Sequence, residues 1–166
     1  EGQLERRGVR PERRVIEFDF RAAPPRVANV LGTQQVLRVK RLNLADGTPF
    51  AVVTVWCPAE MGDHLSRRDV ERHPFYELLG IELRGASQTI GADSVDGADA
   101  ALLGVPAGSP VLRCERITTD THGRAVLMSE ESEMPSTYSM MMRSFESDWT
   151  MSSVGTTFGC RIRAVR

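Results

Sequence analysis

Two segments of this sequence repeat the same series of local features. Residues 25–41 and 97–116 each contain a short apolar run ending in Leu-Gly, a brief connector and a β-prone run. The β-prone runs begin alike, as Val36–Arg38 in the first segment and Val111–Arg113 in the second. A polar turn and another β-prone run follow in both. Because several successive elements agree in order and length, an internal duplication is favoured over chance.

Local signals in both copies predict a short helix followed by a β-hairpin. Pro25 suits the first turn of a helix, and Asp96 is a suitable N-cap for the second helix. Gly32 and Gly104 suit the left-handed conformation that ends a helix. Asp46-Gly47 is a strong hairpin-turn signal between two β-prone runs. Hairpins joined by short helices predict an α+β domain, with helices packed on an antiparallel sheet.

The remaining sequence supplies further elements, and 166 residues suit a single domain, residues 1–166. The start, residues 1–14, is typical of a linker, and the Gly/Ser/Thr-rich end, residues 150–166, of a partly loose tail. Outside the repeats we expect strands at Val15–Phe20, Ile81–Val95 and Leu127–Met134, a short helix within His73–Gly80 and a more ambiguous strand at Tyr138–Phe145.

Composition argues against several kinds of function. A net charge of −1 provides no field that would attract nucleic acid or an anionic membrane. No apolar run approaches the roughly 18 residues of a membrane span. The three cysteines are far apart and odd in number, so we expect reduced thiols in a cytoplasmic protein. The three histidines have no second ligand at helical spacing, and therefore no metal or cofactor is expected.

Polar residues on the first hairpin suggest a binding site. In an extended strand Arg41 and Asn43 share a face with Leu37 and Val39. A buried arginine without a partner is costly, so Arg41 must meet a carboxylate or an anionic ligand. Arg116 occupies the corresponding place in the second copy.

Acidic and aromatic residues elsewhere could complete such a site. Glu131 and Glu133 share one face of the later strand, and Glu130 lies on the other face. Tyr76 begins a short helix, and Tyr138 follows the acidic strand. The alternative is that these charges form solvated faces or cross-strand ion pairs. With two similar halves, a binding site is expected where they meet.

The order of several motifs resembles that of a known family. The likeness covers roughly residues 4–145 and is to the UTRA domain, the effector-sensing domain of HutC-type regulators in the GntR family of bacterial repressors. The motifs that carry it are LxxRGxxP (4–11), VLRVKRLNLADGTPF (36–50), PFY (74–76), QTIGA (88–92), LLGVPAGSPVL (102–112) and RITTDTHGRAVLMSE (116–130).

This resemblance implies a chorismate lyase-like fold, a homodimer and a small-molecule effector rather than an enzymatic substrate. It also implies DNA binding through an N-terminal winged helix that is absent from this chain. The effector-facing residues would be Arg41, Asn43, Tyr76, Glu131 and Tyr138.

The sequence departs from the family pattern at two of the matched positions. Members that sense sugar phosphates typically have Arg-x-Arg before the Ala-Asp-Gly turn and a glutamate on the next strand. Here Asn43 replaces the second arginine and Val53 falls near the glutamate position, so a sugar, a phosphate or a carboxylate all remain candidates. Two other functions stay open: a chorismate lyase-like enzyme that uses Arg41/Glu131 or Arg116/Glu133, and a dimerisation domain with a vestigial pocket.

Overall fold

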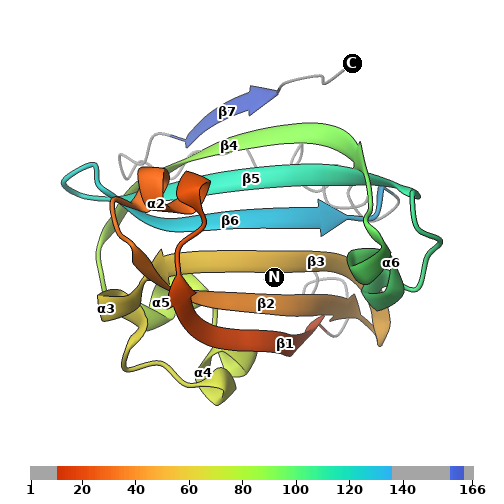
Figure 1. The fold of residues 1–166 in the computed structure, drawn as a ribbon, viewed down its shortest axis with the longest axis horizontal. Helices are drawn as coiled ribbons and strands as arrows, with labels where there is room; N and C mark the ends of the chain where they lie inside the picture. Colours follow the sequence, from red (N-terminus) through yellow and green to blue (C-terminus); the bar gives the residue numbers. More distant parts are fainter. Residues whose placement is uncertain (1–10, 136–157, 163–166) are drawn as a thin grey trace, which may run out of the picture.

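The computed structural model describes residues 11–135 and 158–162, which form one seven-stranded sheet and five short helices around it. Figure 1 shows the arrangement. In chain order the elements are β1 (Pro11–Ala22), α2 (Pro25–Leu31), β2 (Gln35–Ala45), β3 (Thr48–Pro58), α3 (Ala59–Gly62), α4 (Arg67–Arg72), α5 (Phe75–Leu78), β4 (Leu83–Ser94), α6 (Gly97–Leu103), β5 (Pro110–Asp120), β6 (Ala125–Glu133) and β7 (Phe158–Ile162).

The strand order is β1-β2-β3-β6-β5-β4-β7. Six strands pair in antiparallel fashion, and only β7 pairs in parallel, at the outer edge of β4. The predicted α+β class with an antiparallel sheet is therefore confirmed. β7 lies within the segment whose composition suggested a partly loose tail, so at least these five residues pair with the sheet.

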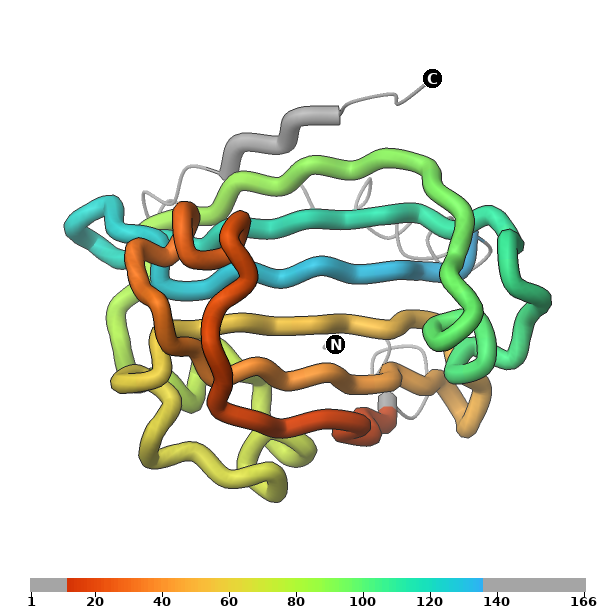
Figure 2. The backbone as a smooth tube through the Cα atoms, viewed as in Figure 1, coloured from red at the N-terminus to blue at the C-terminus, as the bar shows by residue number. Residues whose placement is uncertain are grey.

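The internal duplication is confirmed and is longer than the sequence indicated. The series β1-α2-β2-β3 recurs as β4-α6-β5-β6, and both helices have seven residues. Gly32 and Gly104 end these helices in the predicted left-handed conformation, with φ of 67° and 71°. The strand order places β3 and β6 side by side at the centre, as Figure 2 shows, so the two halves meet there.

Different helices pack on the two faces of the sheet. We call the face that carries Arg41 the Arg41 face. Its core packs against the segment α3–α5 and the residue that follows it, through Leu65, Val70, Phe75 and Leu79. The opposite side, the Arg38 face, is covered by α2 and α6, which Figure 1 shows towards opposite ends of the strands.

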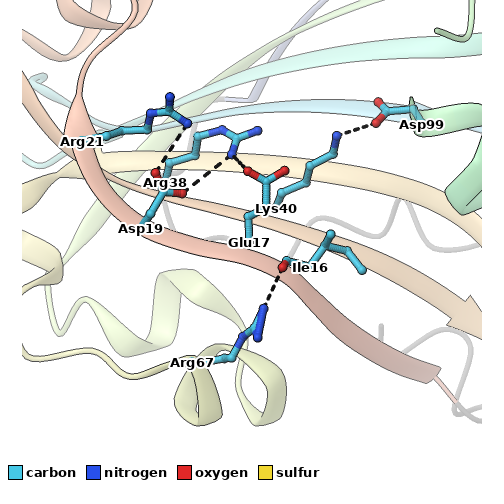
Figure 3. Close-up of polar contacts among 8 residues, drawn as sticks. All are labelled: Ile16, Glu17, Asp19, Arg21, Arg38, Lys40, Arg67 and Asp99. Atoms are coloured by element: carbon cyan, nitrogen blue, oxygen red, sulfur yellow. Dashed lines mark hydrogen bonds and ion pairs between the residues drawn. The ribbon is translucent and has the colours of Figure 1, made fainter. Parts of the chain in front are cut away.

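Two features hold the segment α3–α5 against the sheet, and neither α3 nor α4 was predicted. Ser66 and Asp69 form a capping box that starts α4. Arg67 then donates two hydrogen bonds, of 2.9 and 2.7 Å, to the carbonyl oxygens of Val15 and Ile16, where β1 has a bulge. Figure 3 shows the bond to Ile16. The bulge frees these carbonyls from the regular ladder, so α4 is tied to β1.

The helices on the Arg38 face lock the two halves together. α6 belongs to the second half, yet its Asp99 pairs with Lys40 of β2 at 2.6 Å (Figure 3). Arg38 pairs with Glu17 on the same face. From the first half, Arg26 of α2 pairs with Glu115 and Glu130 of the second. Each half therefore covers and neutralises part of the other.

Some predictions fall outside the part of the chain that the structure describes. They include most of the LxxRGxxP motif, the ambiguous strand at Tyr138–Phe145 and the candidate residue Tyr138. Within the described ranges, no helix is both long and apolar enough to cross a membrane.

Candidate functional site

Two neighbouring rows of side chains cross the centre of the Arg41 face. In the first row Arg41 is in register with Val53 on β3, and Val53 is in register with Glu131 on β6. The second row, one pleat away, runs Arg13, Asn43, Ala51, Glu133 from β1 to β6. The small β3 side chains separate a basic and amide group on one side from two carboxyl groups on the other.

We call Arg13, Arg41, Asn43, Glu131 and Glu133 the polar site. It spans the line where β3 of the first half meets β6 of the second, which is where the duplication led us to expect a binding site. The predicted residues Arg41, Asn43 and Glu131 are therefore brought together on one face.

Arg41 is a cation with two buried nitrogen atoms that lack direct partners among the described residues. Its Nε and Nη1 are out of contact with solvent and have no hydrogen-bond partner among the described residues. Burial lowers the pKa of Arg41, and the negative charge of Glu131 opposes this effect. A guanidinium remains protonated in proteins, so the site holds a positive charge with unused donors. Asn43 contributes a buried Oδ1 that is likewise unpaired in the described structure.

The acidic side of the site has two carboxyl groups in different situations. Burial raises the pKa of Glu131, while Arg41 and Arg116 oppose that rise. Burial also raises the pKa of Glu133, to about 8, and the neighbouring charge of Glu131 adds to the shift. Glu133 is only 5% exposed, and its Oε1 has no hydrogen-bond partner among the described residues. Burial therefore favours the protonated form of Glu133, and in that form its carboxyl group can donate a hydrogen bond.

Arg13 is a second cation beside Arg41. It lies on β1 opposite Asn43, and burial, followed by the charge of Arg41, lowers its pKa. Tyr76 and Glu77 of α5 oppose this effect, so the N-terminal end of α5 lies close enough to act on Arg13. The predicted site residue Tyr76 is thus near the polar site, although its side chain is 54% exposed.

Arg13 and Glu133 were not among the effector-facing residues expected from the sequence. The alternation of side chains along an extended strand indicated Glu133 as a site residue, because it places Glu133 on the same face as Glu131. The sequence indicated Arg13 less clearly. The β2 residue opposite Arg13 depends on the register of β1, and β1 has a bulge after Val15. Arg116 lies one row further along the same face, in register with Ser129, and acts electrostatically on Glu131.

Several charged residues outside the polar site form ion pairs. Glu130 is the clearest case, since it points to the Arg38 face and lies 3.3 Å from Arg26 and 3.6 Å from Arg113. In the described part of the chain, no group of three or more His, Cys, Asp or Glu side chains is placed to hold a metal ion.

Fold and site together define a duplicated α+β domain of the chorismate lyase-like class, with buried polar groups at its centre. The family model described as "UTRA domain" matches residues 6–133. The chain belongs to the UTRA family, because this model matches well over half of its residues.

Individual relatives agree with this assignment. An HTH-type transcriptional regulator of Mycobacterium tuberculosis is 31% identical over 126 residues, which are 70% of this chain and 46% of that protein. The crystal structure of a candidate transcriptional regulator from Streptomyces coelicolor is 34% identical, with a TM-score of 0.71, and the match covers 77% of this chain and 89% of that one.

A more distant structure shows the same fold. The C-terminal domain of the histidine utilization repressor from Pseudomonas syringae has a TM-score of 0.71 at 19% identity, over 76% of this chain and 93% of that one. The chain spans about half the length of the curated relatives that it matches.

Proposed function

We propose that this chain is the ligand-sensing and dimerising part of a bacterial transcriptional regulator. It binds a small polar or anionic effector at the polar site, with Arg41, Asn43, Glu131, Tyr76 and Tyr138 as the contact residues that the sequence suggested. The regulator acts in the cytoplasm and binds DNA through a winged-helix domain outside this chain.

One observation carries the proposal: the buried guanidinium of Arg41 has two nitrogen atoms without hydrogen-bond partners among the described residues. Unsatisfied buried donors on a charged group are expensive, and folding alone gives no reason to retain them. An effector with an anionic or acceptor group would satisfy them. The unpaired Oδ1 of Asn43, on the same face, supports this view.

The mechanism we infer is a shift between two arrangements of the dimer. An effector that binds one arrangement better than the other changes their populations by its difference in affinity. Because the polar site draws residues from both halves of the duplication, a ligand there would bear on the junction between β3 and β6. The attached DNA-binding domains would follow this change.

A ligand screen tests the proposal. We expect thermal-shift measurements with sugars, organic acids, phosphates and amino-acid derivatives to identify at least one stabilising compound. Titration calorimetry should then show saturable binding that Arg41→Ala weakens by at least about tenfold, the scale of one charge-assisted hydrogen bond. Light scattering should show a dimer.

The matched control is Arg38→Ala, which removes a guanidinium from the same strand but from the opposite face. Binding that survives Arg41→Ala would remove this residue from the site. A flat screen with a dimeric protein would favour a vestigial pocket. Turnover of chorismate by the purified chain would instead favour the enzymatic alternative, which the regulator relatives do not suggest.

A further inference from the structure

The polar site has two chemically distinct ends, and this difference bears on the class of ligand. At one end, Arg13 and Arg41 are close enough that the charge of Arg41 lowers the pKa of Arg13. At the other end, Glu133 is buried with an unpaired Oε1. Ala51 and Val53 lie between them, and their buried apolar side chains offer neither end a hydrogen-bond donor or acceptor.

We propose that the site takes a small carboxylic acid that also carries hydroxyl or carbonyl oxygens, with its carboxylate against Arg41 and Arg13 and an oxygen against the carboxyl group of Glu133. This proposal rests on the proposed function, and it adds Arg13 and Glu133 to the residues that recognise the ligand.

The basic end fits a carboxylate by both charge and geometry. A guanidinium donates two parallel hydrogen bonds that match a planar carboxylate, and Arg41 has Nε and Nη1 unused among the described residues. Arg13 adds positive charge from the neighbouring strand, but Glu77 of α5 already offsets part of it. A single negative charge therefore suits this end better than the double charge of a phosphate monoester.

The acidic end fits an uncharged oxygen. Arg41 and Arg116 oppose the pKa rise of Glu131, whereas burial and Glu131 both raise the pKa of Glu133. No cation on the described strands β1, β2 and β5 lowers the pKa of Glu133. A neutral carboxyl group both donates and accepts one hydrogen bond, so it can bind a hydroxyl or a carbonyl oxygen. Once ionised, it would repel an anionic ligand.

Four probe compounds separate the two ends in titration calorimetry on this chain. D-gluconate carries both a carboxylate and hydroxyl groups, hexanoate carries only the carboxylate, D-glucose carries only hydroxyl groups, and D-glucose 6-phosphate carries a phosphate instead of the carboxylate. We expect gluconate to bind at least about tenfold more tightly than each of the others, the scale of one lost hydrogen bond to a charged group.

Two matched pairs of variants assign the ends. Arg13→Gln should weaken gluconate binding about tenfold, whereas Arg14→Gln, whose side chain is 59% exposed beside Glu12, should not. In the wild type the gluconate affinity should fall above about pH 8, by up to about tenfold per pH unit, as Glu133 loses its proton. Glu133→Gln should bind gluconate without this dependence, and Glu130→Gln should retain it.

Each contrary result overturns the proposal. If hexanoate binds as tightly as gluconate, Glu133 does not recognise the ligand. If glucose binds as tightly as gluconate, Arg13 and Arg41 do not recognise it. If glucose 6-phosphate binds more tightly than gluconate, the site prefers a phosphate to a carboxylate. If none of the four binds but another compound from the screen binds through Arg41, this inference fails and the proposed function stands. If no compound binds at all, both fail.

Discussion

Arg41 and Glu131 lie in one row across the sheet, on strands from the two halves of the duplication, and both are in register with Val53. The two charges attract each other, yet no ion pair between them within 4.0 Å is found in the described structure. Arg41 and Glu131 are therefore oppositely charged groups that are held apart by the small side chain of Val53. Such an arrangement suits a ligand between them better than it suits stability.

A first prediction concerns the energetic cost of this arrangement. Arg41→Met keeps most of the side-chain volume and removes a buried charge that lacks a direct partner among the described residues. Because such replacements are often neutral or stabilising, the free energy of unfolding should stay within about 1 kcal/mol of the wild type or rise. Urea denaturation without ligand measures this change. A loss above about 2 kcal/mol would mean that Arg41 has mainly a structural role.

A second prediction concerns pH. The unfolded chain releases the Glu133 proton near the ordinary pKa of 4.5, whereas the folded chain holds it to about 8. The folded state therefore binds more protons between these values, and the contribution of Glu133 to the free energy of unfolding is lost as the pH rises from 4.5 to 8. The slope is at most about 1.4 kcal/mol per pH unit.

The measurement is urea denaturation from pH 5 to pH 8 on the wild type and Glu133→Gln. The variant should show a shallower decline, and Glu130→Gln, which alters the opposite face of the same strand, should follow the wild type. Parallel curves for the wild type and Glu133→Gln would contradict the assignment of a raised pKa to Glu133.

The fold was predictable to the extent that local signals decide it. Gly32 and Gly104 ended their helices as expected, and the repeated helix–hairpin order gave the α+β class and the junction between the halves. α5 lies within the short helix predicted at His73–Gly80, whereas α3 and α4 were missed for a physical reason. α3 has four residues and α4 has six, and packing on the Arg41 face holds this segment rather than a periodic pattern.

The site was only partly predictable. Alternation placed Arg41 with Asn43 and Glu131 with Glu133, because it depends only on each strand being extended. To place Arg13 in the site, one must know how β1 pairs with β2. The bulge after Val15 also changes the face that a simple count along β1 would assign. The raised pKa of Glu133 could not be predicted from the sequence, because it depends on burial by residues far away in the sequence.

A third prediction concerns the coupling of the two halves. The side chains of Lys40 and Asp99 are only 14% and 12% exposed, and they join β2 of the first half to α6 of the second. Lys40→Ala would leave Asp99 buried without its cation and should lower the free energy of unfolding by about 3 kcal/mol. Urea denaturation measures this loss.

The duplication supplies the control for this variant. Val27 occupies in α2 the place that Asp99 occupies in α6, five residues before the terminal glycine. The double variant Lys40→Met/Asp99→Val should therefore recover most of the lost stability. A loss below about 0.5 kcal/mol for Lys40→Ala would instead indicate an ordinary surface pair.

The most direct test of the central claim is a crystal structure of the chain with the most strongly stabilising compound from the ligand screen. We expect an acceptor group of the ligand within hydrogen-bond distance of Nε and Nη1 of Arg41, with the ligand lying over Ala51 and Val53. A ligand bound elsewhere, with those two nitrogen atoms as unpaired as they are now, would contradict the account.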